Sequence, residues 1–297
     1  MTLEQLRIFV AVADTLHMTR AARELNLTQS AVSAAVAALE NRHGVRLFHR
    51  IGRRIELTQA GKLLLSEARA VLARAAAAER ALIEHSELQR GSLAIHASQT
   101  IANYWLPPIL HRYRQRYPKI AASLTIGNSR QVAEQVIEGG ADLGFVEGPI
   151  DEPALADRPL AGDTLTLVVG TGHPWARLDR LDPARLTESD WTLREPGSGT
   201  RAEFDSALRS LGFGVDRLPV TLELPSNEAV RAAVEGGAGA TAISRLVAQA
   251  SLRSGALHEL DFPFPSRPFH LLWHRERSRS HATEAFIAML PEASGSA

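Results

Sequence analysis

Cysteine is absent from the 297 residues of the chain. Its absence excludes disulfides and thiolate metal sites, and it is typical of a protein kept in a reducing compartment. The N-terminal stretch MTLEQLRIFVAVADTL also lacks the basic start of a signal peptide, and polar residues interrupt its apolar positions. We therefore expect a cytoplasmic protein with no membrane partner.

Net charge is absent as well, because 33 basic residues balance 33 acidic ones. The charges are nevertheless distributed unevenly. Residues 42–54 hold five arginines and two histidines but no acid, which predicts a local positive patch on a neutral protein. A chain of this length is expected to form more than one compact unit.

Apolar residues at helical spacing predict three helices before Gly44. The third begins after the N-cap Thr28, and Gly44 ends it. Its outer face carries only small side chains, which lets the backbone approach base edges in a major groove. We interpret the second and third helices as a helix-turn-helix, with an ordinary helical bundle as the alternative.

The next segment, RLFHRIGRRIELT, predicts two short strands around a turn at Gly52 and Arg53. Such a wing can lay arginines along phosphates beside the groove, whereas the alternative is a solvated basic face. Residues 1–58 are thus expected to form an all-α winged helix-turn-helix domain that binds double-stranded promoter DNA. The predicted DNA contacts are Thr28, Gln29, Ser30, Ser33, Ala34, Ala37, Arg50, Arg53 and Arg54.

A linker helix is predicted over residues 59–90. Small or apolar residues recur from Leu57 to His85 at alternating spacings of 4 and 3, which is the period of a coiled coil. Thr58 is the expected cap of this helix. We predict a homodimer paired through residues 59–88, and the alternative is one long surface helix packed on its own domain.

After Gly91, short apolar runs alternate with helical stretches in two successive series. This pattern predicts an α/β effector region of two Rossmann-like subdomains with parallel sheets and helices on both faces. Ligand sites in such folds lie beyond the carboxyl ends of the strands.

One of these strand ends carries the motif REPGSGTR, residues 194–201. It lacks the lysine of a phosphate-binding P-loop, and its glycines adjoin Ser198 directly, unlike those of a hydrolase nucleophile elbow. The motif instead predicts a turn that leads into a helix. The free N–H groups and the positive dipole end of that helix suit an anion.

Two further strand ends carry hydroxyl and amide side chains, and we expect all three to face one interdomain cleft. The ligand that fits best is a small anionic effector, either an oxyanion or a short carboxylate. Two acids leave a zwitterionic or cationic effector open, and each hydroxyl has helix capping as its alternative role. The predicted effector-binding residues are Ser98, Thr100, Asn128, Glu147, Glu195, Ser198, Gly199, Thr200 and Arg201.

Catalysis is the main alternative function, as an α/β hydrolase that uses Ser198. It would require a histidine base and an orienting acid, and none of the histidines stands in such a sequence context. We therefore expect no enzyme, no metal and no cofactor. A solute-binding protein without DNA function is a third interpretation, which the basic wing and the missing export signal disfavour.

Residues 18–65 resemble the N-terminal domain of LysR-type transcriptional regulators. In that family the patterns A-A-x-x-L-x-x-[ST]-Q-x-A-V-S, L-E-x-x-x-G-x-x-L-F-x-R and L-T-x-A-G occur in this order, as they do here. The chain departs at Ser30, where proline is frequent, and at Ala34 and Ala35, where larger polar residues are usual. These departures favour methyl contacts, backbone contacts and DNA shape as sources of specificity.

The resemblance implies a periplasmic-binding-protein-like effector domain over residues 91–297. The chain would cross from subdomain I (about 91–161 and 266–297) to subdomain II (about 162–265) and back. It also implies a homotetramer as the usual assembly and contact with RNA polymerase. TQSAVSAA and REPGSGTR resemble a subgroup of which some members respond to sulfur oxyanions.

Overall fold

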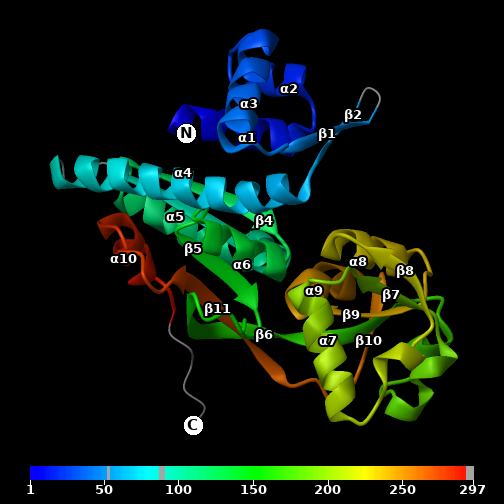
Figure 1. The fold of residues 1–297 in the computed structure, drawn as a ribbon. Coiled ribbons are helices and arrows are strands. Elements are labelled where there is room, and N and C mark those ends of the chain that lie inside the picture. The colour runs from blue at the N-terminus through cyan, green and yellow to red at the C-terminus, as the bar shows by residue number, and fades with distance from the viewer. Residues whose placement is uncertain (52–53, 87–90, 292–297) are drawn as a thin grey trace. The chain divides into compact units, whose positions relative to one another are not determined.

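The computed structural model describes residues 1–51, 54–86 and 91–291 (Figure 1). The chain divides into two compact units. The first comprises residues 1–88 with 138–140, and the second comprises residues 89–137 and 141–297.

The first unit is a three-helix head with a two-stranded wing. Its core packs around Phe9, Val12 and Leu39, and the Phe9 ring contacts that of Phe48 with centroids 5.5 Å apart. The two wing strands pair antiparallel. Besides a long helix that follows the wing, the elements of this unit are α1 (Leu3–Thr15), α2 (Met18–Glu24), α3 (Gln29–His43), β1 (Phe48–Ile51) and β2 (Arg54–Leu57).

Both predicted ends of α3 are confirmed. The Thr28 hydroxyl accepts a hydrogen bond from the Ala31 N–H at 3.2 Å, which is an N-cap contact. At the other end Gly44 adopts the left-handed conformation with φ 64°, which ends the helix without the steric cost that a side chain would add.

The long helix α4 (Gln59–Ser86) begins at the expected cap, since the Gly61 N–H donates to the Thr58 hydroxyl at 2.9 Å. The first residues of its apolar repeat pack against the core of the head. Gly61 and Ala68 are buried, and Leu64 packs on the core of the head. At Val71, the next position of the repeat, the side chain is 42% exposed.

The second unit is built on one continuous sheet with the strand order β4-β3-β5-β11-β6-β9-β7-β8, and β10 pairs with β6 at its side. The strands are β3 (Gly91–Ser98), β4 (Ile120–Gly127), β5 (Leu143–Glu147), β6 (Leu155–Gly170), β7 (Trp191–Arg194), β8 (Val220–Leu224), β9 (Ala240–Ser244), β10 (Leu257–Leu260) and β11 (Ser266–His274).

Helices cover both faces of each half of this sheet, as predicted (Figure 1). In the first half α5 and α10 pack on one face and α6 on the other, and in the second half α7 faces α8 and α9 across the strands. A π-helical turn, η1, precedes α5. These helices are η1 (Ile101–Trp105), α5 (Leu106–Arg116), α6 (Ser129–Glu138), α7 (Gly199–Ser210), α8 (Asn227–Glu235), α9 (Arg245–Ser254) and α10 (His281–Ile287). Short 3-10 turns η2 (Pro174–Arg177), η3 (Pro183–Glu188) and η4 (Val215–Arg217) lie in the second half.

The expectation of parallel sheets is wrong for the middle of the sheet. Strands β6 and β11 pair antiparallel, β6 also pairs antiparallel with β9 and β10, and β11 does so with β5. The reason is topological: β6 carries the chain from the first half to the second, and β11 carries it back, so the two must run in opposite directions. Strand β10 was not expected either.

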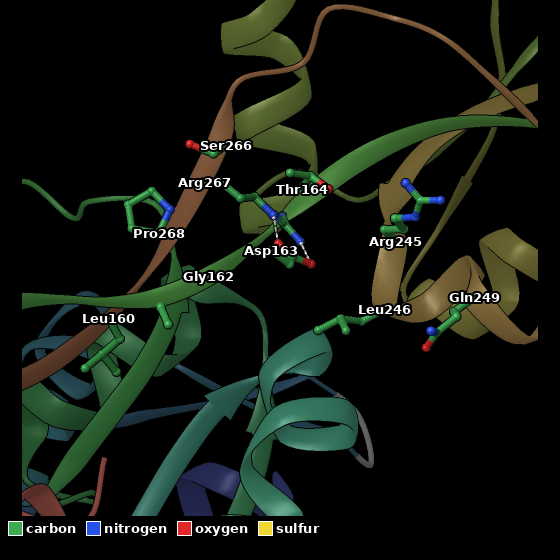
Figure 2. A pocket seen from close by; sticks show the side chains of 11 residues that line it. Leu160, Gly162, Asp163, Thr164, Arg245, Leu246, Gln249, Ser266, Arg267 and Pro268 are labelled. Carbon is green, nitrogen blue, oxygen red and sulfur yellow. Dashed lines mark hydrogen bonds and ion pairs between the residues drawn. The ribbon is translucent and has the colours of Figure 1, made fainter. Parts of the chain in front are cut away.

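The two crossing strands meet at a buried ion pair (Figure 2). Arg267 on β11 is only 2% exposed, and its Nε lies 2.5 Å from Oδ1 of Asp163 on β6. Ser244, at the start of α9, donates a hydrogen bond to the other oxygen of Asp163. A cavity of about 660 Å³ lies between this pair and α9, bordered by Leu160, Arg245, Leu246, Gln249 and Pro268 among others.

Gly162 permits this crossing and provides the first prediction. A Cβ there would overlap the carbonyl oxygen of Arg267 and lie 2.7 Å from Cα of Pro268, so the strands would have to separate. We expect Gly162→Ala to lower the free energy of unfolding by about 2 kcal/mol. Urea denaturation followed by tryptophan fluorescence measures this, because Trp105, Trp175, Trp191 and Trp273 all lie in the second unit.

Gly172→Ala is the matched control. A Cβ at Gly172 would meet no heavy atom within 4 Å. Its effect should stay within about 0.5 kcal/mol of zero. If both variants lowered the free energy of unfolding equally, the crossing would not depend on the close approach at Gly162.

Candidate nucleic-acid interface and ligand site

The outer face of α3 is the candidate DNA-reading surface. Thr28, Gln29 and Ser30 at its start are exposed, as are Ala34 and Ala37 further along. Ser33 is half-buried, and its hydroxyl accepts a hydrogen bond from the Gln29 side chain at 3.1 Å. The face is therefore flat, and small side chains surround a few hydroxyl and amide groups.

The wing holds the remaining predicted DNA contacts. Strands β1 and β2 form where they were expected, with Phe48 opposite Leu57. Arg53 lies outside the described residues, and so do the side chains of Arg50 and Arg54. Their roles as phosphate contacts remain predictions.

In the second unit, three neighbouring strands end side by side and carry predicted ligand residues. The parallel register places Ser98 at the end of β3 beside Gly127 at the end of β4, and Ala97 pairs with Phe145 on β5. Asn128 directly follows β4, and Glu147 ends β5. These three side chains therefore share one edge of the sheet, as the sequence predicted.

The start of α7 packs against this edge from the other half of the unit. A Cβ on Gly199 would lie 2.7 Å from Oε2 of Glu147, and the Ser129 hydroxyl donates to that oxygen at 3.1 Å. The protein's own carboxylate thus lies at the helix start where the sequence predicted an anion. Ser198 is the N-cap of α7, accepting from the Arg201 N–H at 3.5 Å.

Two hydroxyls at this junction lack a hydrogen-bond partner. Ser98 Oγ and Thr200 Oγ1 are buried, with residue exposures of 2% and 1%, and neither bonds to any residue that the structure describes. An unsatisfied buried hydroxyl is costly and rare, so each is a candidate ligand contact. The other predicted residues are also buried, except Glu195 and Arg201, which are half-buried.

A chain of hydrogen bonds connects the two halves across the junction. Thr100 Oγ1 accepts from the Asn227 amide at 3.1 Å, and the Asn227 carbonyl accepts from Arg194 at 2.8 Å. Arg194 also donates twice to Glu195, whose Oε1 accepts from the Asn128 amide at 3.2 Å. Three predicted residues thus belong to one network.

Asn227 and Arg194 belong to this network but were not among the predicted ligand residues. Asn227 follows Ser226 at a strand-to-helix junction, which is the same signal that identified Ser98 and Asn128. It was therefore detectable. Arg194 lies within the quoted motif, but nothing in the letters shows that its side chain is 4% exposed and turned inward.

Arg201 is not brought together with the other candidate ligands. Its Nε lies 2.9 Å from Asp205 one turn along α7, and Nη1 donates to the Arg194 carbonyl at 3.2 Å. The i, i+4 spacing of an arginine and an aspartate on one helix provides the physical reason.

Glu195 is held in its charged form. Partial burial by itself would raise its pKa, but hydrogen bonds and the charge of Arg194, with the Asn128 amide, lower the pKa below its ordinary value. A carboxylate at this position therefore stays ionised at neutral pH and neutralises Arg194.

Glu203 on α7 is the opposite case. Burial raises its pKa, and the nearby charges of Glu147 and Asp163 raise it further, against the opposing effect of Arg267 and His270. A Cβ on Gly148, at the end of β5, would overlap its carboxylate. The charged form of Glu203 is therefore disfavoured where the two halves meet.

The structure provides no support for the hydrolase alternative at Ser198. His173 contacts Ser189, His258 contacts the Leu178 carbonyl and His270 contacts Asp157. No histidine among the described residues has a hydrogen bond to the Ser198 hydroxyl, which is engaged as a helix cap.

Within residues 1–51, 54–86 and 91–291, no helix is long and apolar enough to cross a membrane.

Comparison with known proteins identifies the class that this architecture defines. Residues 3–62 match the family model "Bacterial regulatory helix-turn-helix protein, lysR family", and residues 86–295 match "LysR substrate binding domain". The chain is 37% identical over 289 residues to "Uncharacterized HTH-type transcriptional regulator YeiE" of Escherichia coli (strain K12), covering 96% of each chain.

Two further comparisons extend this result. The chain is 34% identical to the "RuBisCO operon transcriptional regulator" of Acidithiobacillus ferrooxidans, over 99% of this chain and 94% of that protein. Among solved structures, CbnR, a LysR family transcriptional regulator, superposes with a TM-score of 0.71 at 22% identity, covering 97% and 98% of the two chains.

The chain belongs to the LysR family of bacterial helix-turn-helix transcriptional regulators. It is a DNA-binding regulator with a C-terminal effector-binding domain, and its family is one of regulators, not of enzymes.

The electrostatics at Glu203 generate the second prediction. Because its pKa is raised in the folded protein, the folded state holds the proton more tightly than the unfolded state, and stability falls as the pH rises above the ordinary value of 4.5. Glu203→Gln removes the ionisable group and with it this loss of stability at high pH. We expect its melting temperature to exceed that of the wild type at about pH 8, with a difference that shrinks towards about pH 4.

Thermal unfolding measured across this pH range tests the expectation. Glu276→Gln, at an exposed position on the same unit, is the control and should follow the wild type at every pH. If Glu203→Gln were less stable than the wild type at high pH, the charge of Glu203 would be a stabilising one.

Proposed function

We propose that the chain is a cytoplasmic regulator that senses a small oxyanion at the junction between the two halves of its effector domain. The observation that supports this most directly is the pair of buried, unpartnered hydroxyls, Ser98 Oγ and Thr200 Oγ1. They lie on opposite halves, at the carboxyl edge of one sheet half and in the first turn of a helix from the other. A bound oxyanion would satisfy both.

The position of Glu147 narrows the class of anion. A fully ionised anion at the start of α7 would be repelled by this carboxylate, which lies there already. An oxyanion that keeps one proton can donate it to Glu147 while it accepts from Ser98 and Thr200. Hydrogen sulfite and hydrogen phosphate have this chemistry, and among them we favour a sulfur oxyanion.

Binding would act through the equilibrium between open and closed junctions. Ser98 and Thr200 are buried, so an effector would reach them when the halves separate and the Thr100–Asn227 hydrogen bond opens. An effector that bridges Ser98 and Thr200 favours the closed form. The change would alter how paired DNA-reading heads are placed on a promoter and how RNA polymerase gains access.

Ligand binding provides the third prediction. Thr200→Val keeps the shape of the side chain but removes the hydroxyl, and we expect the dissociation constant of the anion to rise about tenfold to a hundredfold. Isothermal titration calorimetry with sulfite, sulfate, phosphate and short carboxylates measures it. DNA binding without effector should be unchanged.

Thr241→Val is the matched control. Its hydroxyl is also buried and unpartnered, but it lies inside strand β9 and not at the junction. Its anion affinity should equal that of the wild type. Binding of none of the anions below about millimolar concentration, or binding of amines instead, would contradict the proposal.

The assembly is a separate part of the proposal. We infer a homodimer through α4, within residues 59–88, and a homotetramer as the working form. Support comes from the apolar repeat along α4, in which Val71 is 42% exposed. Two-fold pairing would present two reading heads to pseudo-palindromic DNA.

The apolar repeat provides the fourth prediction. Val71→Glu places a charge in the proposed helix pair, and we expect the dimer dissociation constant to rise at least about tenfold because the charge would be desolvated. Leu63→Glu is the control, since Leu63 is 68% exposed but lies off the repeat. Analytical ultracentrifugation measures both. Dissociation caused by Leu63→Glu alone would place the dimer on another face.

A further inference from the structure

One acidic residue is buried inside the DNA-reading head. Glu40 lies near the end of α3 and is 8% exposed, although an isolated buried carboxylate is strongly disfavoured. A negative charge in a phosphate-binding domain also opposes its main attraction to DNA. Glu40 therefore requires a structural reason.

Its contacts supply that reason. Oε1 accepts from the Leu47 N–H at 2.8 Å and from the Phe48 N–H at 3.3 Å, and Oε2 lies 3.1 Å from Nη1 of Arg46. Leu47 and Phe48 form the entry to the wing, and Phe48 is the first residue of β1. A single side chain of the recognition helix thus holds the start of the wing.

The opposite side of the same segment is also anchored. The Thr58 hydroxyl, at the start of α4, donates to the Arg46 carbonyl at 2.7 Å, and the Thr58 N–H donates to the Leu47 carbonyl at 3.0 Å. Residues 46–48 are therefore fixed from two directions. Glu40 is the only one of these anchors that connects them to the recognition helix.

A hollow lies between the helix and the wing. Its volume is about 500 Å³, and its lining includes Ser33, Ala37, Glu40, Arg46 and His49. Ser33 and Ala37 are on the predicted base-reading face, and His49 is on β1. The angle between helix and wing determines whether both can contact one DNA duplex at once.

We propose that Glu40 is a positioning residue for DNA binding: it fixes the wing to the recognition helix through the Leu47 and Phe48 N–H groups and touches no DNA. The outer oxygen is covered by Arg46, whose side chain is 81% exposed, so the carboxylate is not presented to phosphates. This inference rests on the DNA-binding head and is independent of the effector.

The sign of the effect distinguishes positioning from simple charge. If Glu40 acted only as a negative charge, its removal would strengthen binding to DNA. If it positions the wing, its removal weakens binding because the wing arginines that are predicted to contact phosphates are no longer held in place. Glu40→Gln removes the charge but keeps an oxygen that can accept from both N–H groups.

The experiment measures binding of the full chain to a random-sequence 40-base-pair duplex by fluorescence anisotropy at several salt concentrations. We expect Glu40→Ala to weaken binding about tenfold and to reduce the salt slope by about two, as two phosphate contacts are lost. Glu40→Gln should stay within about threefold of the wild type and keep the slope. Glu4→Gln, at an exposed acid on α1, is the charge control and should not weaken binding.

Several results would overturn the proposal. If the Glu40→Ala variant bound DNA more tightly than the wild type, Glu40 would act only through its negative charge. The salt slope of the Glu40→Ala variant could also be unchanged at a temperature where circular dichroism shows that it is folded. Glu40 would then contribute to stability but not to the position of the wing. If Glu40→Ala does not fold, Glu40→Asp decides, because its shorter carboxylate keeps the charge but loses reach: weakened binding with a reduced slope supports positioning, and wild-type behaviour refutes it.

Discussion

Two strands running in opposite directions hold the effector domain together, and the candidate ligand site depends on them. Asp163 and Arg267 pair where β6 and β11 cross, and Gly162 lets the backbones approach. Removing either member of a buried ion pair is strongly destabilising, because it leaves the other charge buried without a partner. Separating the two strands at the crossing would therefore cost this ion pair.

The sequence was a good guide to elements and a poorer guide to their connections. Caps such as Thr28 and Ser198 and the strand ends at Ser98 and Asn128 are local features, and local features can be read from neighbouring residues. The direction of β6 relative to β11 depends on pairing between residues more than one hundred positions apart. No local pattern encodes it, which is why parallel sheets were expected there.

The site shows the same division. The junction brings together Asn128, Glu147 and Gly199 because three strand ends and a helix start share an edge. What the letters did not show is that these groups already satisfy one another. Arg194 neutralises Glu195, and Glu147 lies at the start of α7, so most of the expected receptor groups are engaged within the protein. Ser98 and Thr200 have no hydrogen-bond partner among the described residues, and in the proposed function they are the groups that a ligand would contact.

The two units solve the burial of carboxylates in different ways. In the head, Glu40 accepts two backbone N–H groups and an arginine, and this fixed geometry suits a surface that has to match a rigid duplex. At the junction, burial raises the pKa of Glu203 and disfavours its charged form, while Glu147 accepts from the Ser129 hydroxyl and lies at the start of α7. Ionisation of the buried Glu203 carboxylate therefore lowers the stability of the junction. This difference fits the proposed mechanism, in which the reading head stays fixed while the effector domain moves between arrangements.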